Sequence, residues 1–185
     1  MERATTKDST ALFTFMKKTF EATYAHLNEP VFFEQYVSTH FVEALIENEL
    51  ENPSIEFWII KENDEIIAYN KLNINKLHDA KTLYKAINGS MTELERIYVL
   101  ETQKGKGLGK ILIEKALERA AFHQNEWLWL GVWEENKKAL DFYKAMNFEI
   151  FGSHDFYMGD DLQNDFLMRK KVILQDISQS VPYTT

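Results

Sequence analysis

A glycine-rich stretch, Lys104-Gly105-Lys106-Gly107-Leu108-Gly109-Lys110, constrains the fold of this chain more than any other feature. It follows a strand-like run at 92–100 and precedes an amphipathic pattern that predicts a helix beginning at about Gly107. Glycine allows positive φ angles and close approach of a ligand, and the first N–H groups of a helix attract anions. The stretch is therefore typical of a loop that binds a phosphate or pyrophosphate, with three lysines as countercharge.

Spacing separates the phosphate motifs that compete for this loop. A P-loop requires glycine five positions before its Gly-Lys-Ser/Thr, but Lys104 stands there and Ile111 follows Lys110. A dinucleotide fingerprint that starts at Gly105 requires glycine where Lys110 stands. Both motifs are excluded, and a strand-to-helix turn without a ligand stays open for the loop taken alone.

The hydrophobic periodicity predicts alternating helices and strands within one domain, residues 1–173. Helical spacing covers 8–27, about 32–50, the segment after the glycine stretch, and 135–146. Strand patterns cover 55–61, 65–75, 92–100, 127–133, 148–158 and 166–172. The residues Glu62-Asn63-Asp64 predict a hairpin turn, and 76–90 predict a polar connection with a helical turn near 80–87. Residues 174–185 form a mostly polar C-terminal tail whose composition is compatible with disorder.

Composition excludes several function classes. Cysteine is absent, which removes disulfides, thiolate zinc sites and cysteine nucleophiles, and the five histidines show no ligand spacing, so no metal is expected. The 29 acidic residues outnumber the 21 basic ones, and the net charge of −8 disfavours nucleic acid and anionic membranes as partners. A cationic partner would be favoured, but the simpler interpretation, that negative charge keeps the protein soluble, stays open, and charge alone decides nothing.

The sequence also carries expectations about location and assembly. The first ten residues hold no apolar stretch, and the longest apolar run, 127–133, is too short to span a bilayer. We therefore expect a cytoplasmic protein that does not enter membranes. The aromatic residues outside the motifs face either a core or a partner chain, so a homodimer stays open.

From Glu93 to Met168 the chain resembles the GNAT superfamily of N-acetyltransferases. The resemblance rests on Glu93-Leu94-Glu95-Arg96-Ile97-Tyr98-Val99, on the loop pattern Arg/Gln-x-x-Gly-x-Gly/Ala with Lys104 in its first place, on 129–136, and on Ala139, Phe142-Tyr143 and Met146-Asn147-Phe148. Asn147 stands where the family pattern has glycine, and asparagine also tolerates the left-handed end of a helix. Together with 154–160, these segments resemble the PaiA-type polyamine N-acetyltransferases in particular.

The resemblance implies an α/β (α+β) GNAT fold: a mixed central sheet of about seven strands, splayed between the fourth and fifth, with about four helices. It implies acetyl-CoA as cosubstrate, with the backbone of Ile97, Tyr98 and Val99 holding pantetheine and polarising the acetyl carbonyl. Asn136 would bind pantetheine, and Tyr143 would protonate the departing thiolate. The pyrophosphate would lie on the loop formed by Lys104, Gly105, Lys106, Gly107, Leu108, Gly109 and Lys110.

Residue spacing shows which of these side chains share a face, and it adds a candidate base. Asn136 and Tyr143 lie seven residues apart, so both side chains emerge on one face of a helix. Glu93 and Glu95 lie two apart on a strand and share a face, where a carboxylate attracts a cationic amine and accepts its proton. Glu95 is the favoured base, with Glu93 or water as alternatives, although Glu95 could equally solvate the strand or pair with Arg96.

Other polar residues could complete an acceptor site but are left outside the catalytic set. They are His154, Tyr157, Asp160 and Asp161. The predicted function is transfer of acetyl to a primary amine of a small cationic acceptor, such as spermidine or spermine, by direct attack without a covalent enzyme intermediate. A CoA-binding regulator without catalysis, and an acetyltransferase acting on a protein amine or a basic antibiotic, are the alternatives.

Overall fold

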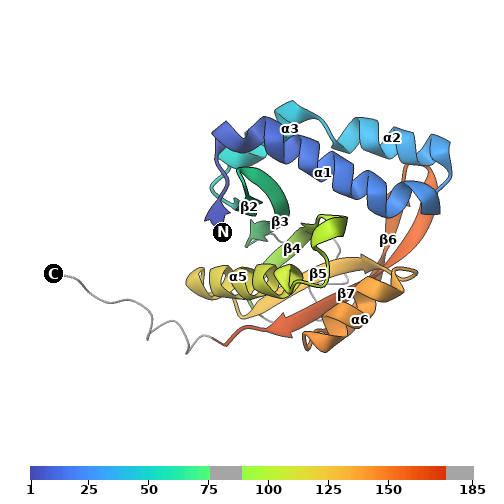
Figure 1. The fold of residues 1–185 in the computed structure, drawn as a ribbon. Helices are drawn as coiled ribbons and strands as arrows, with labels where there is room; N and C mark the ends of the chain where they lie inside the picture. Colours follow the sequence, from blue (N-terminus) through green and yellow to red (C-terminus); the bar gives the residue numbers. More distant parts are fainter. Residues whose placement is uncertain (76–88, 174–185) are drawn as a thin grey trace.

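The computed structural model describes residues 1–75 and 89–173, which form a mixed sheet covered by helices on both faces (Figure 1). The described strands pair in the order β1-β2-β3-β4-β5-β7-β6, and β4 with β5 is the parallel pair. They are β1 (Glu2–Arg3), β2 (Ile55–Glu62), β3 (Glu65–Ile74), β4 (Met91–Val99), β5 (Trp127–Trp133), β6 (Glu149–Met158) and β7 (Asp161–Lys171). The predicted sheet of about seven strands is confirmed.

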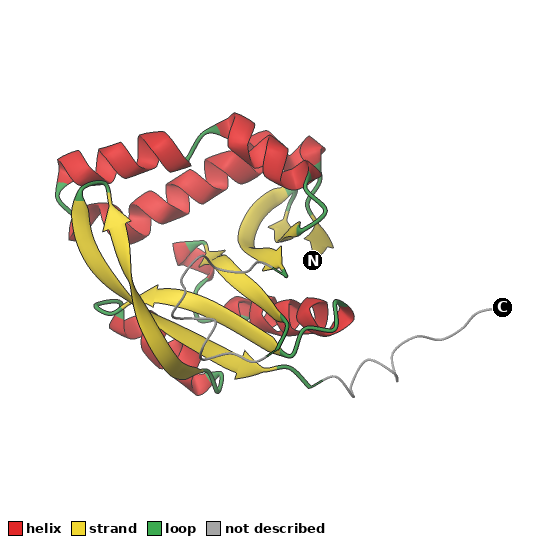
Figure 2. Cartoon of the chain, turned by 180° about the vertical axis from the view of Figure 1, so that it is seen from behind, coloured by secondary structure: helices red, strands yellow, loops and turns green. Residues whose placement is uncertain are grey.

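The helices form two layers. One layer consists of α1 (Ser9–Tyr24), α2 (Pro30–His40) and α3 (Glu43–Glu51), and the other of α5 (Leu108–Phe122) and α6 (Lys137–Ala145). Seen from behind, the long β6–β7 hairpin rises from the sheet to the first layer (Figure 2). A β-carbon on Gly159, at the hairpin tip, would lie 2.7 Å from the carbonyl oxygen of Phe32 in α2, so the hairpin packs tightly against that helix.

Local backbone chemistry explains the β2–β3 hairpin. Asn63 and Asp64 both have left-handed backbone angles, with φ of 51° and 64°. Turns of this kind match the twist of two antiparallel strands, and asparagine and aspartate tolerate the conformation better than most residues. The predicted turn is confirmed.

Three elements differ from the sequence prediction. The helix predicted over 32–50 is two helices, because Phe41 leaves the helix to pack in the core, 4.8 Å from the ring of Phe20. As a result the described residues hold five α-helices rather than about four. Strand β7 begins five residues before the predicted position 166, because the mostly polar residues 161–165 pair with β6 without an alternating apolar pattern. The short β1 was not predicted.

Two expectations fall on segments beyond the described part of the chain: the helical turn at 80–87 and the tail at 174–185. That residues 1–173 make a single domain stays a prediction. The described residues nevertheless show where the apolar side chains gather. One core lies between the sheet and α5–α6, and a second lies between the sheet and α1–α3.

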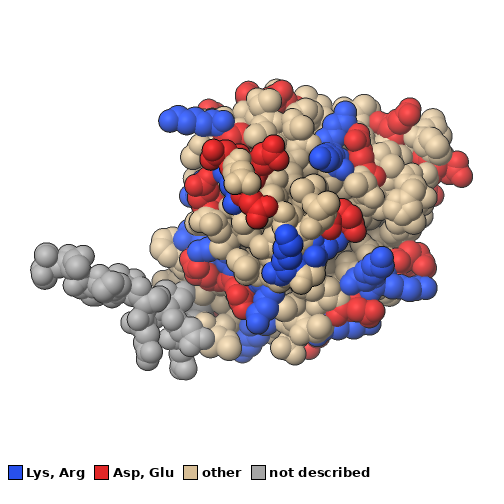
Figure 3. Space-filling model, in the orientation of Figure 1, with Lys and Arg blue, Asp and Glu red and all other residues tan. Residues whose placement is uncertain are grey.

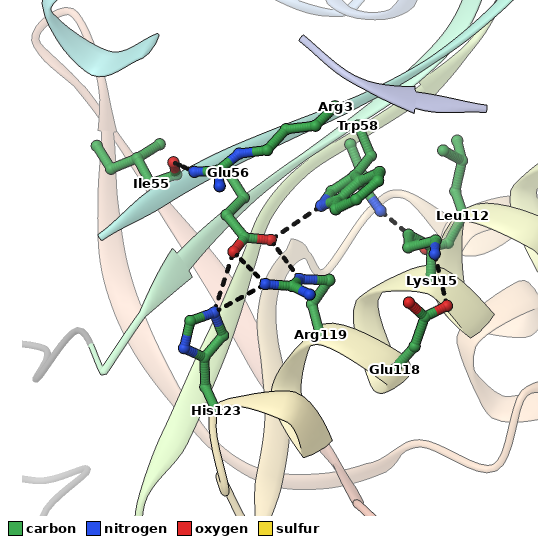
Figure 4. Close-up of polar contacts among 10 residues, drawn as sticks. Arg3, Ile55, Glu56, Trp58, Leu112, Lys115, Glu118, Arg119 and His123 are labelled. Carbon is green, nitrogen blue, oxygen red and sulfur yellow. Dashed lines mark hydrogen bonds and ion pairs between the residues drawn. The ribbon is translucent and has the colours of Figure 1, made fainter. Parts of the chain in front are cut away.

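A buried carboxylate joins the edge of the sheet to α5 (Figure 4). Glu56 of β2 is 1% exposed and accepts two hydrogen bonds from Arg119, at 2.8 and 2.9 Å. Its carboxylate also lies 3.0 Å from His123 Nε2 and accepts a bond from the indole of Trp58 at 3.0 Å. This network fixes the position of α5, whose N-terminus carries the glycine loop.

The sheet opens between its two parallel strands. β4 and β5 pair at Met91–Trp127, Thr92–Leu128 and Glu93–Trp129, and no further pairs follow although both strands continue. Beyond Glu93 and Trp129 the strands therefore diverge. The predicted splay between the fourth and fifth strands is confirmed, and it places unpaired strand edges beside the N-terminal end of α5.

Candidate functional site

The glycine loop presents open backbone to solvent at the start of α5. Gly105 and Gly107 have φ of +79° and +81°, and a β-carbon on either would meet no atom within 4 Å. Gly107 caps α5, so the first N–H groups of the helix follow directly. Open backbone beside a helix N-terminus is suited to an anion such as a pyrophosphate. Gly109 has another role, because its β-carbon would lie 3.2 Å from Phe142 of α6.

The lysines of the loop are paired only with exposed partners. Lys104 contacts Glu101, Lys106 donates a 2.6 Å hydrogen bond to Gln103, and Lys110 lies 3.8 Å from Glu114. Exposed pairs of this kind contribute little to stability, so an arriving phosphate can replace them at low cost. Basic side chains gather among acidic ones near the middle of the face seen in Figure 1 (Figure 3).

The predicted pantetheine strand lines the splay. Ile97, Tyr98 and Val99 pair with Asn70, Tyr69 and Ala68 of β3, and all three lie beyond the last β4–β5 pair. The edge of β4 away from β3 is therefore open to hydrogen bonding at these residues. This is the backbone geometry that an extended ligand with amide groups can use.

Asn136 and Tyr143 bring α6 to the same opening. Asn136 caps α6 and accepts a 3.2 Å hydrogen bond from the amide of Ala139, a structural role that sequence spacing did not reveal. Tyr143 is 8% exposed, and burial together with the nearby Tyr24 hydroxyl raises its pKa. Tyr143 therefore remains protonated through neutral pH, as a proton donor must.

Tyr24, at the C-terminal end of α1, connects these groups. Burial raises the pKa of its hydroxyl, while interactions with the side chains of Asn136 and Tyr98 lower it. Residues from α1, β4 and α6 thus meet at one point of the splay. Sequence reasoning missed Tyr24, since nothing in the local pattern of α1 distinguishes it from a packing residue.

Glu93 and Glu95 share a face, as their spacing predicts, because both accept a hydrogen bond from the amide of Asn73. Lys71 also donates to Glu95 at 2.8 Å, and the guanidinium of Arg96 lies 3.6 Å away. Burial raises the pKa of Glu95, but Lys71 and Arg96 outweigh it and hold the pKa at about 2. A shift in pairing between β3 and β4 makes Glu95 the bulged residue, because Leu94 pairs with Leu72 and Arg96 with Lys71.

The remaining candidates lie along the β6–β7 hairpin. Asp160 and Tyr157 are exposed near its tip, and Asp161 accepts a hydrogen bond from Gln163. His154 lies farther down, with Nε2 4.0 Å from the carboxylate of Asp165 on β7. Across residues 1–75 and 89–173, no three His, Cys, Asp or Glu side chains form a group that could hold a metal ion. No helix in the same residues is long and apolar enough to cross a membrane.

Comparison with known proteins identifies the family. Residues 15–148 match the acetyltransferase (GNAT) family. This chain belongs to the GNAT family of acetyltransferases. Over 167 residues it is 33% identical to an uncharacterized N-acetyltransferase in the pepI 3′ region of Lactobacillus delbrueckii subsp. lactis. The aligned region covers 90% of this chain and 94% of that protein.

Solved structures share the fold at low sequence identity. A PaiA N-acetyltransferase from Thermoplasma acidophilum, in complex with coenzyme A, superposes with a TM-score of 0.71 and 20% identity over 92% of this chain and 96% of that one. NAA60 from Arabidopsis thaliana, in complex with acetyl-CoA, has a TM-score of 0.67 and 16% identity over 92% and 97%. At these identities the likeness shows the GNAT fold and leaves the acceptor undetermined.

The loop geometry predicts the effect of Gly107→Val on cosubstrate binding. A branched side chain is strained at φ +81° and fills the open space in which a pyrophosphate would approach the backbone. We expect the Kd for acetyl-CoA to rise about tenfold or more, which equals a loss of about 1.4 kcal/mol. Isothermal titration calorimetry would measure the change. Gly152→Ala is the control, because its β-carbon makes ordinary contact with Leu167, and an unchanged Kd in Gly107→Val would exclude this loop as the pyrophosphate site.

Proposed function

We propose that this GNAT N-acetyltransferase transfers acetyl from acetyl-CoA to a primary amine of a small cationic acceptor, a polyamine such as spermidine or spermine. The observation that carries the proposal is the presence of carboxylates on both sides of the splay. Glu93 and Glu95 lie on β4, whereas Asp165 lies on β7 with Glu134 near it. Carboxylates on two walls suit an acceptor that carries more than one positive charge.

The hydroxyl of Tyr36 links the two walls. Burial raises its pKa, the charge of Arg96 lowers it, and the charges of Glu95 and Asp165 both raise it. Both carboxylates therefore lie within electrostatic reach of one hydroxyl on α2. This supports a single acceptor site beneath α1 and α2, in which an extended cation meets negative charge at both ends.

The residues around the splay fit acetyl-CoA as the second substrate. The backbone at Gly105 and Gly107 and the N-terminus of α5 would hold the pyrophosphate, with countercharge from Lys104, Lys106 and Lys110. The open edge of β4 at Ile97, Tyr98 and Val99 would hold pantetheine and orient the carbonyl. Leu108 is the first residue of α5, and the absence of a side chain at Gly109 lets the ring of Phe142 pack against the helix. Both residues would therefore shape the loop.

Direct attack would complete the reaction. The neutral amine forms a bond to the thioester carbon, the carbon–sulfur bond breaks, and Tyr143 supplies a proton to the thiolate. The nitrogen then loses one proton, which replaces the proton that Tyr143 gave. Glu95 stays a candidate base. Its pKa of about 2 makes it a weak one, which favours a role in attracting the ammonium group over a role in removing its proton.

A thiol-release assay tests this function. Acetyl-CoA would be incubated with spermidine, spermine, a lysine-containing peptide, a peptide with a free N-terminus and an aminoglycoside, at low and high salt. We expect saturable turnover with the polyamines and a KM that rises with salt, because charge attraction is screened. Turnover with a peptide or aminoglycoside alone would refute the polyamine proposal, and binding of acetyl-CoA without any turnover would favour a regulatory protein.

A further inference from the structure

A histidine and an aspartate face each other on the β6–β7 hairpin. His154 and Asp165 are directly paired positions of the two strands, and His154 Nε2 lies 4.0 Å from Asp165 Oδ2. A β-carbon on Gly131 of β5 would lie 3.4 Å from both side chains. Because residue 131 is glycine, no side chain of β5 lies between the strand and the His154–Asp165 pair. A larger residue at position 131 would come into contact with both side chains.

The pair lies at the splay. Gly131 comes two residues after Trp129, the last residue of β5 that pairs with β4. The charge of Asp165 also raises the pKa of Tyr24, whose hydroxyl interacts with Asn136 and Tyr98 and in turn raises the pKa of Tyr143. Asp165 therefore lies within electrostatic reach of Tyr24, which in turn lies within electrostatic reach of the proposed acid Tyr143.

The carboxylate of Asp165 has bonding capacity left for a ligand. Its side chain is 15% exposed, yet Oδ1 is buried and accepts no hydrogen bond from any residue in the described part of the chain. A buried carboxylate oxygen without a donor is costly, and an incoming ammonium group would supply that donor. Glu95 differs, because Lys71 and Asn73 already donate to it.

We propose that Asp165 is the base that takes a proton from the amine of the acceptor, and that His154 positions its carboxylate. The inference rests on the proposed acetyl transfer, but it holds for any amine acceptor. An ammonium nitrogen gives one proton to Asp165, and its lone pair then forms the bond to the thioester carbon. When the carbon–sulfur bond breaks, the nitrogen loses a second proton, which replaces the one that Tyr143 gave to the thiolate. The proton on Asp165 leaves to solvent, so the net reaction releases one proton.

The surroundings of Asp165 suit this role. Burial and the nearby charge of Glu134 raise its pKa to about 6. The titratable groups within electrostatic reach of it are His154 on β6, Glu134 directly after β5, Tyr24 on α1 and Tyr36 on α2. A carboxylate with this pKa is ionised at neutral pH, and it is a stronger base than Glu95. Activity carried by Asp165 is lost as the pH falls through about 6.

The test compares Asp165→Asn with Glu95→Gln and with Asp64→Asn, a control in the exposed β2–β3 turn, where asparagine also tolerates the left-handed backbone. Each variant would be assayed from pH 5 to 9 with whichever acceptor of the panel the wild type acetylates. We expect Asp165→Asn to lower kcat about 10²-fold and to remove the fall in activity below pH 6, with the Kd for acetyl-CoA unchanged. Asp64→Asn should behave as wild type, and Glu95→Gln should raise the acceptor KM more than it lowers kcat.

Two results would overturn the assignment. One is an Asp165→Asn enzyme whose kcat stays within threefold of wild type, or that keeps the loss of activity below pH 6. The other is an NMR titration of the Asp165 carboxyl carbon in the unmodified protein with a midpoint near the ordinary pKa of aspartate, which applies even if the variant does not fold. Turnover with peptides but not polyamines would refute only the proposed substrate, whereas no turnover with any amine would refute both proposals.

Discussion

Replacing Tyr143 with phenylalanine is expected to lower kcat by about 10²-fold or more, with little change in the Kd for acetyl-CoA. The substitution removes one oxygen and leaves the ring, which packs against Phe142 and Phe148 at centroid distances of 5.4 and 5.7 Å. Burial holds the pKa of Tyr143 above its usual value, so its proton is present when the thiolate forms. Stopped-flow or steady-state detection of released thiol would measure kcat.

The control for this prediction is Tyr157→Phe, because Tyr157 is 58% exposed on β6. We expect it to retain the wild-type kcat. A Tyr143→Phe enzyme with normal kcat would mean that another group, or water, protonates the thiolate. If the variant also unfolded at a lower denaturant concentration, its kcat would be measured at saturating acetyl-CoA, because a bound ligand stabilises the folded state.

Replacing Glu56 with alanine is expected to lower the free energy of unfolding by about 3–5 kcal/mol. The carboxylate is 1% exposed, and its removal leaves the guanidinium of Arg119 and the indole of Trp58 without their acceptor (Figure 4). A charge that loses its partner in a buried site is far more costly than a broken surface pair. Urea unfolding followed by tryptophan fluorescence would measure the change.

Glu56 also predicts how stability depends on pH. Burial raises its pKa, but the hydrogen bonds from Arg119, His123 and Trp58 prevail and lower the pKa from 4.5 to about 2. A lowered folded-state pKa adds stability above the unfolded value, and this stability is lost as the pH falls from about 4.5 toward 2. Glu95 titrates in the same window in both proteins, so the wild-type minus Glu56→Ala difference isolates Glu56.

The exposed Glu65→Ala is the matched control, since surface substitutions change stability by about 0.5 kcal/mol or less. A Glu56→Ala protein that unfolds at the wild-type urea concentration would show that Arg119 and His123 find other partners. A difference curve that stays flat between pH 5 and 2 would show that the carboxylate is not stabilised by the folded state.

Local sequence chemistry predicted the parts of the site that depend on one short segment. The glycines at 105 and 107 lie where the backbone is left-handed, and the helix begins one residue after Gly107. The hairpin at Asn63-Asp64 follows from the same kind of argument. Glu93 and Glu95 share a face because residues two apart on a strand do so, and their common partner Asn73 agrees.

Longer-range contacts explain what the sequence prediction missed. Residues 161–165 lie outside the predicted strand 166–172, yet they belong to β7 because β6 supplies their pairing partners. The helix predicted over 32–50 breaks because Phe41 is buried beside Phe20, a partner more than twenty residues away. The spacing of apolar residues indicates which face of a segment is buried. It does not indicate which distant segment covers that face.

The conformational preferences of glycine and asparagine and the spacing of apolar residues are properties of short segments of sequence. They were enough to determine the β4 strand, the glycine loop and the α5 helix of this acetyltransferase. The pKa values of the carboxylates around this strand, loop and helix depend instead on packing. Lys71 lowers the pKa of Glu95 from the neighbouring strand, while burial and Glu134 raise that of Asp165 on β7. Because a pKa depends on burial and on neighbours brought together from remote segments, only the folded chain distinguishes the weak base from the stronger one.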